Sequence, residues 1–184
     1  MNIIETSIPD LLLLKPNVFY DNRGFFCESY NKNTFNDSGI NYDFGQDNHS
    51  KSQYGILRGR HFQIPPYDQT KLVRVVTGKV LDVAVDLRLG SPTYSQHFAV
   101  ELSADNHLQL LIPRGFAHGF VVLSENVDFL YKCDNYYSKS HESGLMYNDA
   151  ELNIDWKIPF SDIILSEKDR EYKPLSQTEI PFIY

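Results

Sequence analysis

Three β-rich segments of the chain contain titratable side chains that could point into the interior of a barrel. His61 closes the run Leu57-Arg58-Gly59-Arg60-His61, His118 follows a Pro/Gly turn in Ile112 to Phe120, and Tyr131 lies in Phe129-Leu130-Tyr131-Lys132. A polar group inside a fold costs free energy unless another group pairs with it, and a histidine with a pKa near neutrality suits proton transfer. The three residues are therefore candidates for acid–base chemistry. The pattern alone favours structural roles for the two histidines, and it leaves Tyr131 as either a core tyrosine or a proton donor.

The backbone around His61 decides which neighbours could act with it. Strict strand alternation puts Leu57, Gly59 and His61 on one face and turns Arg58 away. A β-bulge at Gly59 would bring Arg58 to the side of His61, where a guanidinium could bind a diphosphate. Without the bulge, the segment contains a surface arginine beside a structural histidine.

Several other chemistries lack their motifs. The sequence has no His-x-His pair for a metal, no Gly-x-Ser-x-Gly nucleophile elbow and no Gly-x-Gly-x-x-Gly phosphate loop. Cys27 and Cys133 are the only cysteines, and both lie near aromatic residues. We interpret them as two buried, reduced thiols.

The bulk composition is that of one globular domain, which we expect to span residues 1–184. Hydrophobic residues make up 42% of the chain and charged residues 22%, with a formal net charge of -7. The negative charge argues against a nucleic-acid surface but permits a local basic site for an anionic small ligand. No apolar run is long enough for a membrane span, and the first residues do not resemble a signal peptide, so a cytoplasmic protein is expected.

Short β-rich runs separated by glycine and proline indicate the elements that position these residues. The run 71–76 and the run 80–87 meet across Thr77-Gly78-Lys79, which predicts a β-hairpin, and further strands are expected at 96–102, 107–112, 119–123 and 128–133. Short helices are expected at 33–37 and after Ser166, a residue suited to a helix N-cap. The pattern predicts a mainly β fold, an antiparallel sandwich or jelly-roll barrel with short peripheral helices.

Nine sequence segments, taken together and in order, resemble the dTDP-4-dehydrorhamnose 3,5-epimerase family over nearly the whole chain, from about Ile8 to Asp169. The matching segments are 19–29, 46–52, 57–63, 71–74, 82–88, 91–94, 112–120, 129–132 and 165–169. The resemblance implies a cupin-like jelly roll that needs no metal or other cofactor, and a homodimer.

The resemblance also implies catalytic roles. His61 matches the base and Asp169 its carboxylate partner, Tyr131 matches the acid that acts from the opposite face, and Lys71 matches a residue near the developing enolate. For Asp169 the simpler alternative is a carboxylate that stabilises a helix start.

Further matched positions are expected to bind the substrate. They are Gln46, Asn48, Arg58, His118, Tyr137 and Lys168, together with an N-terminal set, Phe19, Arg23, Phe26 and Glu28, that in this family reaches the site partly from the neighbouring subunit.

The expected reaction is the conversion of dTDP-4-dehydro-6-deoxy-D-glucose to dTDP-4-dehydro-L-rhamnose. The alternatives are a 3-epimerase or ketoisomerase on a related 4-keto sugar nucleotide, a metal-dependent cupin enzyme, and a non-catalytic sugar-nucleotide binding module. One departure from the family is Arg60, where an apolar residue usually precedes the base. A bulge at Gly59 would turn Arg60 away from the sugar.

Overall fold

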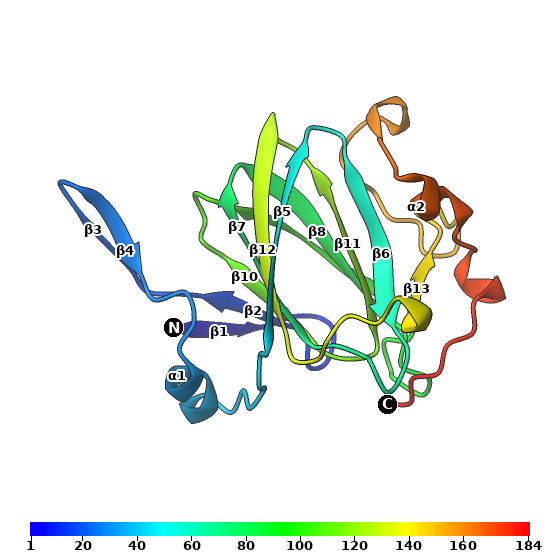
Figure 1. The fold of residues 1–184 in the computed structure, drawn as a ribbon, viewed down its shortest axis with the longest axis horizontal. Coiled ribbons are helices and arrows are strands. Elements are labelled where there is room, and N and C mark those ends of the chain that lie inside the picture. Colours follow the sequence, from blue (N-terminus) through cyan, green and yellow to red (C-terminus); the bar gives the residue numbers. More distant parts are fainter.

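Antiparallel strands form most of the regular structure in the computed structural model, which describes residues 1–184 (Figure 1). One sheet has six strands in the order β1 (Asn2–Glu5), β2 (Leu12–Lys15), β10 (Gln109–Ile112), β7 (Lys71–Thr77), β12 (Asn126–Cys133) and β5 (Gln46–Gln53). The second has five, in the order β13 (Glu142–Leu145), β6 (Leu57–Gln63), β11 (Phe116–Val122), β8 (Lys79–Asp86) and β9 (His97–Ser103).

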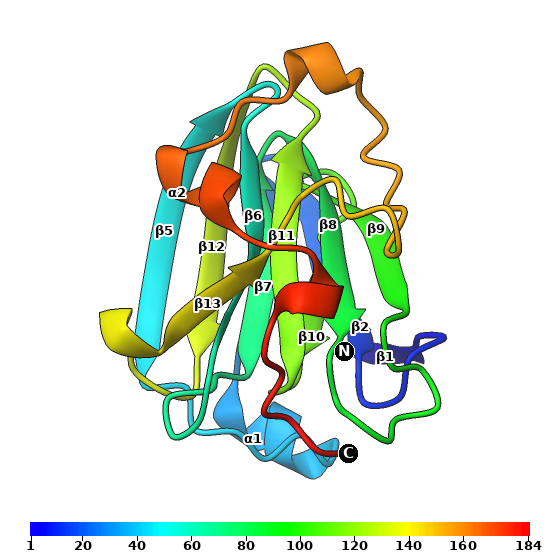
Figure 2. The same cartoon turned by 90° about the vertical axis from the view of Figure 1, so that its right-hand side faces the viewer.

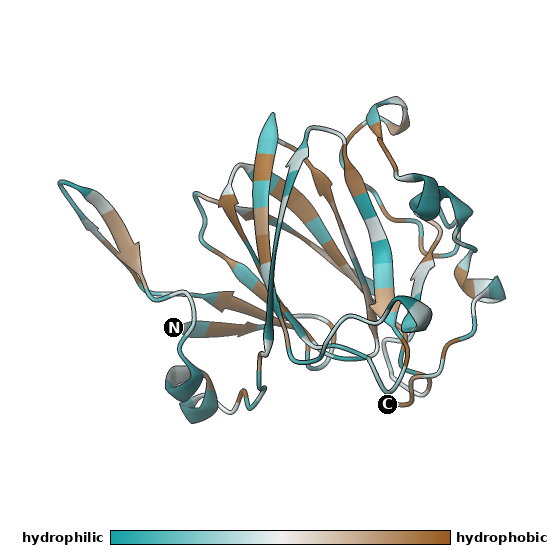
Figure 3. Cartoon of the chain, viewed as in Figure 1, coloured by the Kyte–Doolittle hydropathy of each residue, from teal (hydrophilic) through white to brown (hydrophobic).

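The main core lies between the inner faces of these sheets. Val73, Val75 and Phe129 from the six-stranded sheet pack in one cluster with Ala84 and Phe120 from the five-stranded sheet. Apolar and polar residues alternate along many of the strands, as Figure 3 shows, which is the pattern of sheets that bury one face. Two facing antiparallel sheets form the cupin-like jelly roll that the sequence predicts.

A second core covers the outer face of the five-stranded sheet. Figure 2 shows the C-terminal segment running across this face. Leu152, Trp156 and Leu175 from that segment pack against Val83 and Val85 of β8. This cover carries the last helix, α2 (Glu167–Glu171), to the edge of β6.

The predicted hairpin between the runs 71–76 and 80–87 is wrong. Both strands exist, but β7 pairs with β10 and β12, whereas β8 pairs with β9 and β11. Gly78, at φ +73°, turns the chain from one sheet to the other. The turn signal is local, whereas strand pairing is decided by burial, and here Val75 and Ala84 pack in the core between the two sheets.

Both short helices form close to their predicted positions. The helix α1 (Lys32–Asp37) begins after Asn31, whose side chain accepts hydrogen bonds from the backbone N–H groups of Asn33 and Thr34. The helix α2 begins after Ser166, whose Oγ accepts from the backbone N–H of Asp169 at 3.1 Å. Three 3₁₀ turns, Lys139–His141, Phe160–Asp162 and Leu175–Gln177, complete the helical elements, and no helix is long and apolar enough to cross a membrane.

A two-stranded ribbon, β3 (Val18–Asp21) and β4 (Gly24–Cys27), projects away from the barrel (Figure 1). It pairs with neither large sheet. Cys27 is therefore only half-buried, unlike the prediction, whereas Cys133 is fully buried, and both thiols are free.

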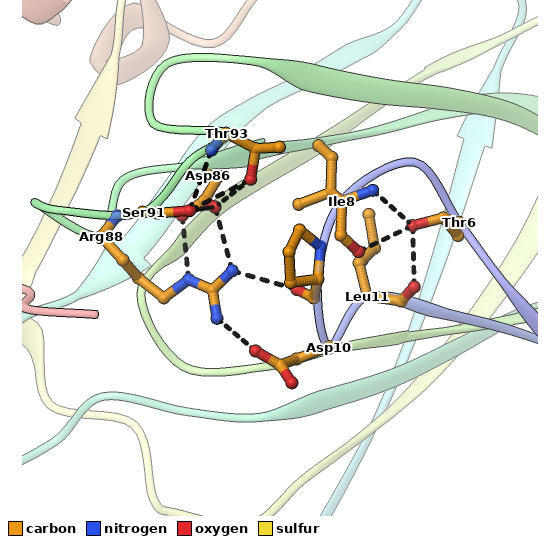
Figure 4. Close-up of polar contacts among 9 residues, drawn as sticks. Thr6, Ile8, Asp10, Leu11, Asp86, Arg88, Ser91 and Thr93 are labelled. Atoms are coloured by element: carbon orange, nitrogen blue, oxygen red, sulfur yellow. Dashed lines mark hydrogen bonds and ion pairs between the residues drawn. The ribbon is translucent and has the colours of Figure 1, made fainter.

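A buried polar network joins the N-terminal turn to the loop between β8 and β9 (Figure 4). Asp86 is fully buried and accepts two hydrogen bonds, each 2.9 Å long, from the Arg88 guanidinium. Ser91 and Thr93 donate to the same carboxylate. Arg88 also donates to Asp10 at 2.7 Å, which ties the turn before β2 to the barrel.

Candidate active site

A cavity of about 540 Å³ is formed by side chains of both sheets and of the segment leading into α2. Its lining residues are Ser50, Ile56, Leu57, Arg58, Gly59, His61, Lys71, His118, Gly119, Phe120, Phe129, Tyr131, Ile164, Leu165, Ser166, Lys168 and Asp169. All four residues predicted to be catalytic are in this set.

A β-bulge in β6 shapes one wall. His118 of β11 pairs with His61 of β6, and Phe120 pairs with Arg58. Between these two pairs β11 has one residue and β6 has two, so β6 contains one extra residue. The extra residue brings both Arg58 and His61 to the cavity, as the hypothesis of a bulge at Gly59 requires.

His61 and Asp169 form a close pair. Nε2 of His61 lies 2.5 Å from Oδ1 of Asp169, and Ser166 donates to Oδ2 at 2.7 Å. Burial by itself would raise the pKa of Asp169, but the hydrogen bonds from His61 and Ser166 outweigh it and hold that pKa below its ordinary value. A neutral imidazole that donates from Nε2 to this carboxylate has its free lone pair on the other ring nitrogen, Nδ1.

Tyr131 and Lys71 belong to the opposite wall. Tyr131 lies on β12 and Lys71 on β7, both in the six-stranded sheet, whereas His61 lies in the five-stranded sheet. Burial raises the pKa of Tyr131, so its phenol stays protonated at neutral pH. Burial lowers the pKa of Lys71.

Three of the predicted substrate-binding residues line the same cavity, namely Arg58, His118 and Lys168. His118 is held by Asp82, whose two carboxylate oxygens lie 3.0 and 2.9 Å from Nε2. Arg58 donates to Ser52 at 3.0 Å through Nε. A guanidinium, an imidazole and an ammonium group thus line the same cavity.

Gln46, Asn48 and Tyr137 lie next to this cavity rather than in its lining. Asn48 pairs with Tyr131 across β5 and β12, so it shares the inner face with that tyrosine. Oε1 of Gln46 accepts from the backbone N–H of Tyr137 at 3.2 Å. The phenol of Tyr137 donates to Glu142 at 2.8 Å, and Glu142 also forms an ion pair with Lys168, which connects this group to the cavity.

The four predicted N-terminal residues lie elsewhere. Phe19, Arg23 and Phe26 belong to the projecting ribbon, and none lines the cavity of its own chain. Arg23 pairs with Asp21, and Glu28, just past the ribbon, accepts a hydrogen bond of 3.0 Å from Asn31.

Arg60 points away from the cavity. It is fully buried, does not line the cavity, and none of its three guanidinium nitrogens has a hydrogen-bond partner. Burial lowers its pKa to about 10. The bulge thus leaves Arg60 outside the cavity that Arg58 and His61 line.

Sequence reasoning missed two carboxylates that hold site residues, Asp82 and Glu142. Asp82 could have been found, because it interrupts an apolar strand and is predicted on the face opposite Leu81 and Val83. Glu142 has no comparable signal, since it lies in a polar stretch and meets Lys168 only through the fold.

The arrangement is suited to moving protons. It holds a histidine–carboxylate pair on one wall, and on the other a protonated phenol and a half-buried amine that could stabilise negative charge. No three His, Cys, Asp or Glu side chains are grouped so that they could hold a metal ion. The fold and this site define a jelly-roll protein of the cupin-like class with an acid–base centre inside the barrel.

Comparison with known proteins places the chain more narrowly. The family model described as dTDP-4-dehydrorhamnose 3,5-epimerase matches residues 5–177. A dTDP-4-dehydrorhamnose 3,5-epimerase of Salmonella typhimurium is 54% identical over 179 residues, which cover 96% of this chain and 97% of the relative. The chain belongs to the dTDP-4-dehydrorhamnose 3,5-epimerase family, whose members are isomerases.

Solved structures agree with this assignment. The Legionella pneumophila epimerase in complex with dTDP-4-keto-L-rhamnose superposes with a TM-score of 0.95 at 46% identity, covering 100% of this chain and 98% of that one. A 3'-monoepimerase of Streptomyces bikiniensis with dTDP-quinovose is also similar, with a TM-score of 0.85 at 29% identity over 93% of this chain and 86% of that one.

Proposed function

We propose that this protein inverts C3 and C5 of dTDP-4-dehydro-6-deoxy-D-glucose to give dTDP-4-dehydro-L-rhamnose. The observation that carries the proposal is the placement of His61 and Tyr131 on facing sheets around one cavity. Inversion requires removal of a proton from one face of a carbon and delivery of a proton to the other face, which two groups on opposite walls can perform.

His61 is the proposed base. Its Nδ1 would take a proton from the carbon next to the ketone, and Asp169 would stabilise the imidazolium that forms. The electrons of the broken C–H bond would move into an enolate at C4. Lys71, half-buried on the cavity wall, would stabilise the negative charge on the enolate oxygen.

Tyr131 is the proposed acid. Its raised pKa keeps the phenol protonated, so it can deliver a proton to the opposite face of the enolate carbon. His61 would then release its proton to solvent and Tyr131 would take one up, after which the cycle would repeat at the second carbon. Arg58 and Lys168 supply the positive charge expected for a diphosphate, while Tyr137, 55% exposed, offers an aromatic face for the base of the nucleotide.

The main alternative is inversion at C3 alone. The similarity to the double epimerases favours the first proposal, because the Salmonella typhimurium relative is 54% identical whereas the monoepimerase of Streptomyces bikiniensis is 29% identical.

We also propose that the protein acts as a homodimer in which the ribbon serves the site of the second copy. Phe19 and Phe26 are 63% and 69% exposed and lie outside their own cavity. The family resemblance assigns these positions to substrate contact, which in this chain would require another subunit. We further infer that residues 1–184 work as one domain in the cytoplasm, where the two free thiols would stay reduced.

Exchange in deuterated water tests the reaction. With the 4-keto sugar nucleotide as substrate, we expect deuterium at both C3 and C5, and no incorporation with His61→Ala. Label at C3 alone would establish the monoepimerase alternative, and undiminished exchange by His61→Ala would overturn the assignment of the base.

A further inference from the structure

The ribbon β3–β4 touches the rest of its own chain through very few groups. Its strands pair only with each other, and a single hydrogen bond joins residues 18–27 to the barrel. In that bond, the hydroxyl of Tyr20 lies 3.1 Å from Nε2 of His107. The orientation of the ribbon therefore depends on a small contact.

The His107 ring also packs against Phe25, the residue opposite Tyr20 in the ribbon. Its ring centroid lies 4.6 Å from that of Phe25 and 6.4 Å from that of Tyr20. Tyr20 and Phe25 are cross-strand partners, so they point to the same face of the ribbon. One imidazole thus contacts both aromatic residues of that face.

The other face of the ribbon carries the residues that the proposed function needs. Phe19 pairs with Phe26, and strand alternation turns this pair away from Tyr20 and Phe25. A contact that holds the Tyr20–Phe25 face consequently presents the Phe19–Phe26 face outward.

Hydrogen bonds from Asn106 stabilise the loop that carries His107. Oδ1 of Asn106 accepts from the backbone N–H groups of Ser103 and Leu108 at 3.1 and 3.0 Å, and its Nδ2 donates to the carbonyl of Glu101 at 2.9 Å. His107 has a φ of +55°, a left-handed conformation in which histidine and asparagine are enriched among non-glycine residues. The imidazole is therefore fixed relative to β9 and β10.

We propose that His107 is a positioning residue that orients the ribbon of its own chain for delivery of Phe19 and Phe26 to the site of a second copy. This inference rests on the proposed homodimer. Loosening the ribbon lowers the fraction of time in which it is correctly placed, and the apparent affinity for substrate falls by that fraction. Because the chemistry at His61 and Tyr131 of the receiving copy is not altered, we expect loosening of the ribbon to raise KM and to leave kcat nearly unchanged.

The variant His107→Asn removes the ring while asparagine tolerates the left-handed backbone, and Tyr20→Phe removes only the hydrogen bond. We expect KM to rise about two- to tenfold in His107→Asn and less in Tyr20→Phe, with kcat changed little. The matched control is Tyr54→Phe, because Tyr54 is also an exposed tyrosine with one hydrogen bond, 3.1 Å to Asp162, but lies outside the ribbon.

Mixed dimers separate this inference from the function on which it rests. A His61→Ala copy and a Phe26→Ala copy are co-expressed with different affinity tags and purified through both. The only complete site then has the base of the second copy and the ribbon of the first. Activity with the wild-type KM supports delivery between copies, and activity no higher than that of Phe26→Ala alone overturns both the delivery and the role of His107.

The decisive measurement adds His107→Asn to the His61→Ala copy. A KM two- to tenfold higher than in the first mixed dimer supports the inference, because only the donating ribbon has changed. An unchanged KM overturns the role of His107 while leaving delivery between copies intact.

Discussion

Gly59 lies directly against the carboxylate of Asp169. A Cβ added at Gly59 would fall 2.6 Å from Oδ1, the oxygen that also contacts His61. The two residues are 110 positions apart in the chain, and only the absence of a side chain at Gly59 lets α2 approach β6 this closely. The bulge and the dyad are therefore one structural unit.

Replacing Gly59 with alanine should disable the dyad. The new methyl group must displace Asp169, because the contact is closer than a Cβ atom can approach an oxygen. We expect kcat to fall about 10²- to 10⁴-fold, the usual contribution of a positioned base. Since the effect acts through Asp169, the double variant Gly59→Ala/Asp169→Asn should be little worse than Asp169→Asn alone. Wild-type activity, or fully additive losses, would contradict this explanation.

The alkaline limb of the pH–rate profile should report Lys71. The ammonium form stabilises the proposed enolate, and burial lowers the pKa of Lys71 from its ordinary value of 10.5. Activity should therefore fall as pH rises through a midpoint below 10.5. Loss of the proton of Tyr131, whose pKa is raised above 10, would also reduce activity at alkaline pH.

The variant Lys71→Arg distinguishes the two groups. Arginine keeps its charge throughout this range, so the midpoint in kcat/KM should move to higher pH even if the maximal rate drops. A midpoint that does not move would assign the limb to another group.

Arg60 should be dispensable. It is fully buried without a hydrogen bond. The nearby carboxylate of Asp149, which interacts electrostatically with Arg60, keeps its hydrogen bonds from the backbone N–H groups of Glu151 and Leu175 when Arg60 is removed. Replacing a buried charge with an apolar side chain of similar volume is often neutral or stabilising by about 1–4 kcal/mol. We expect Arg60→Leu to keep its kcat/KM and to lose no stability in urea titration. The matched variant Arg58→Leu should lose activity, because Arg58 lines the cavity.

The network around Asp86 should contribute strongly to stability. Removing Arg88 leaves a carboxylate buried without its ion-pair partner, since Asp86 has no solvent exposure. We expect Arg88→Met to lower the free energy of unfolding by about 3–5 kcal/mol. A loss below about 1 kcal/mol in chemical denaturation would show that the network is not a stabilising element.

Asp86 should also make stability depend on pH. Burial alone would raise its pKa, but the hydrogen bonds from Arg88, Ser91 and Thr93 hold it below the ordinary value of 3.8. Because the folded pKa is depressed, this contribution is present above the unfolded pKa and is lost as pH falls below about 4. As the pH is lowered below about 4, the Asp86→Asn variant should therefore lose less of its free energy of unfolding than the wild type does, as measured by thermal unfolding. Equal losses in the two proteins would contradict this role of Asp86.

Local patterns were sufficient for much of the molecule. The strands around Val73, Val83 and Phe129 and the cap at Ser166 depend on residues within a few positions of one another, and each is found where the sequence predicts it. The bulge next to Gly59 is one of two backbone arrangements that the sequence left open. Asp169 satisfies both interpretations of its position, since it accepts from Ser166 at the helix start and also pairs with His61.

The pairing of distant segments is where prediction from pattern failed. The turn at Gly78 indicates a hairpin, but β7 and β8 belong to different sheets because Val75 and Ala84 are buried against the same core from opposite sides. Glu142 reaches Lys168 through the return of the C-terminal segment, for which no local signal exists.

By itself, the sequence determined the residue types of the site, the strands that carry them and the glycine that permits the bulge, because these follow from side-chain chemistry and the period of a strand. The tertiary structure alone decided that Asp82 holds His118, that Arg60 lies outside the cavity and that the ribbon leaves its own site. The physical reason is that such contacts join segments far apart in the chain, and only the burial of both sheet faces brings those segments together.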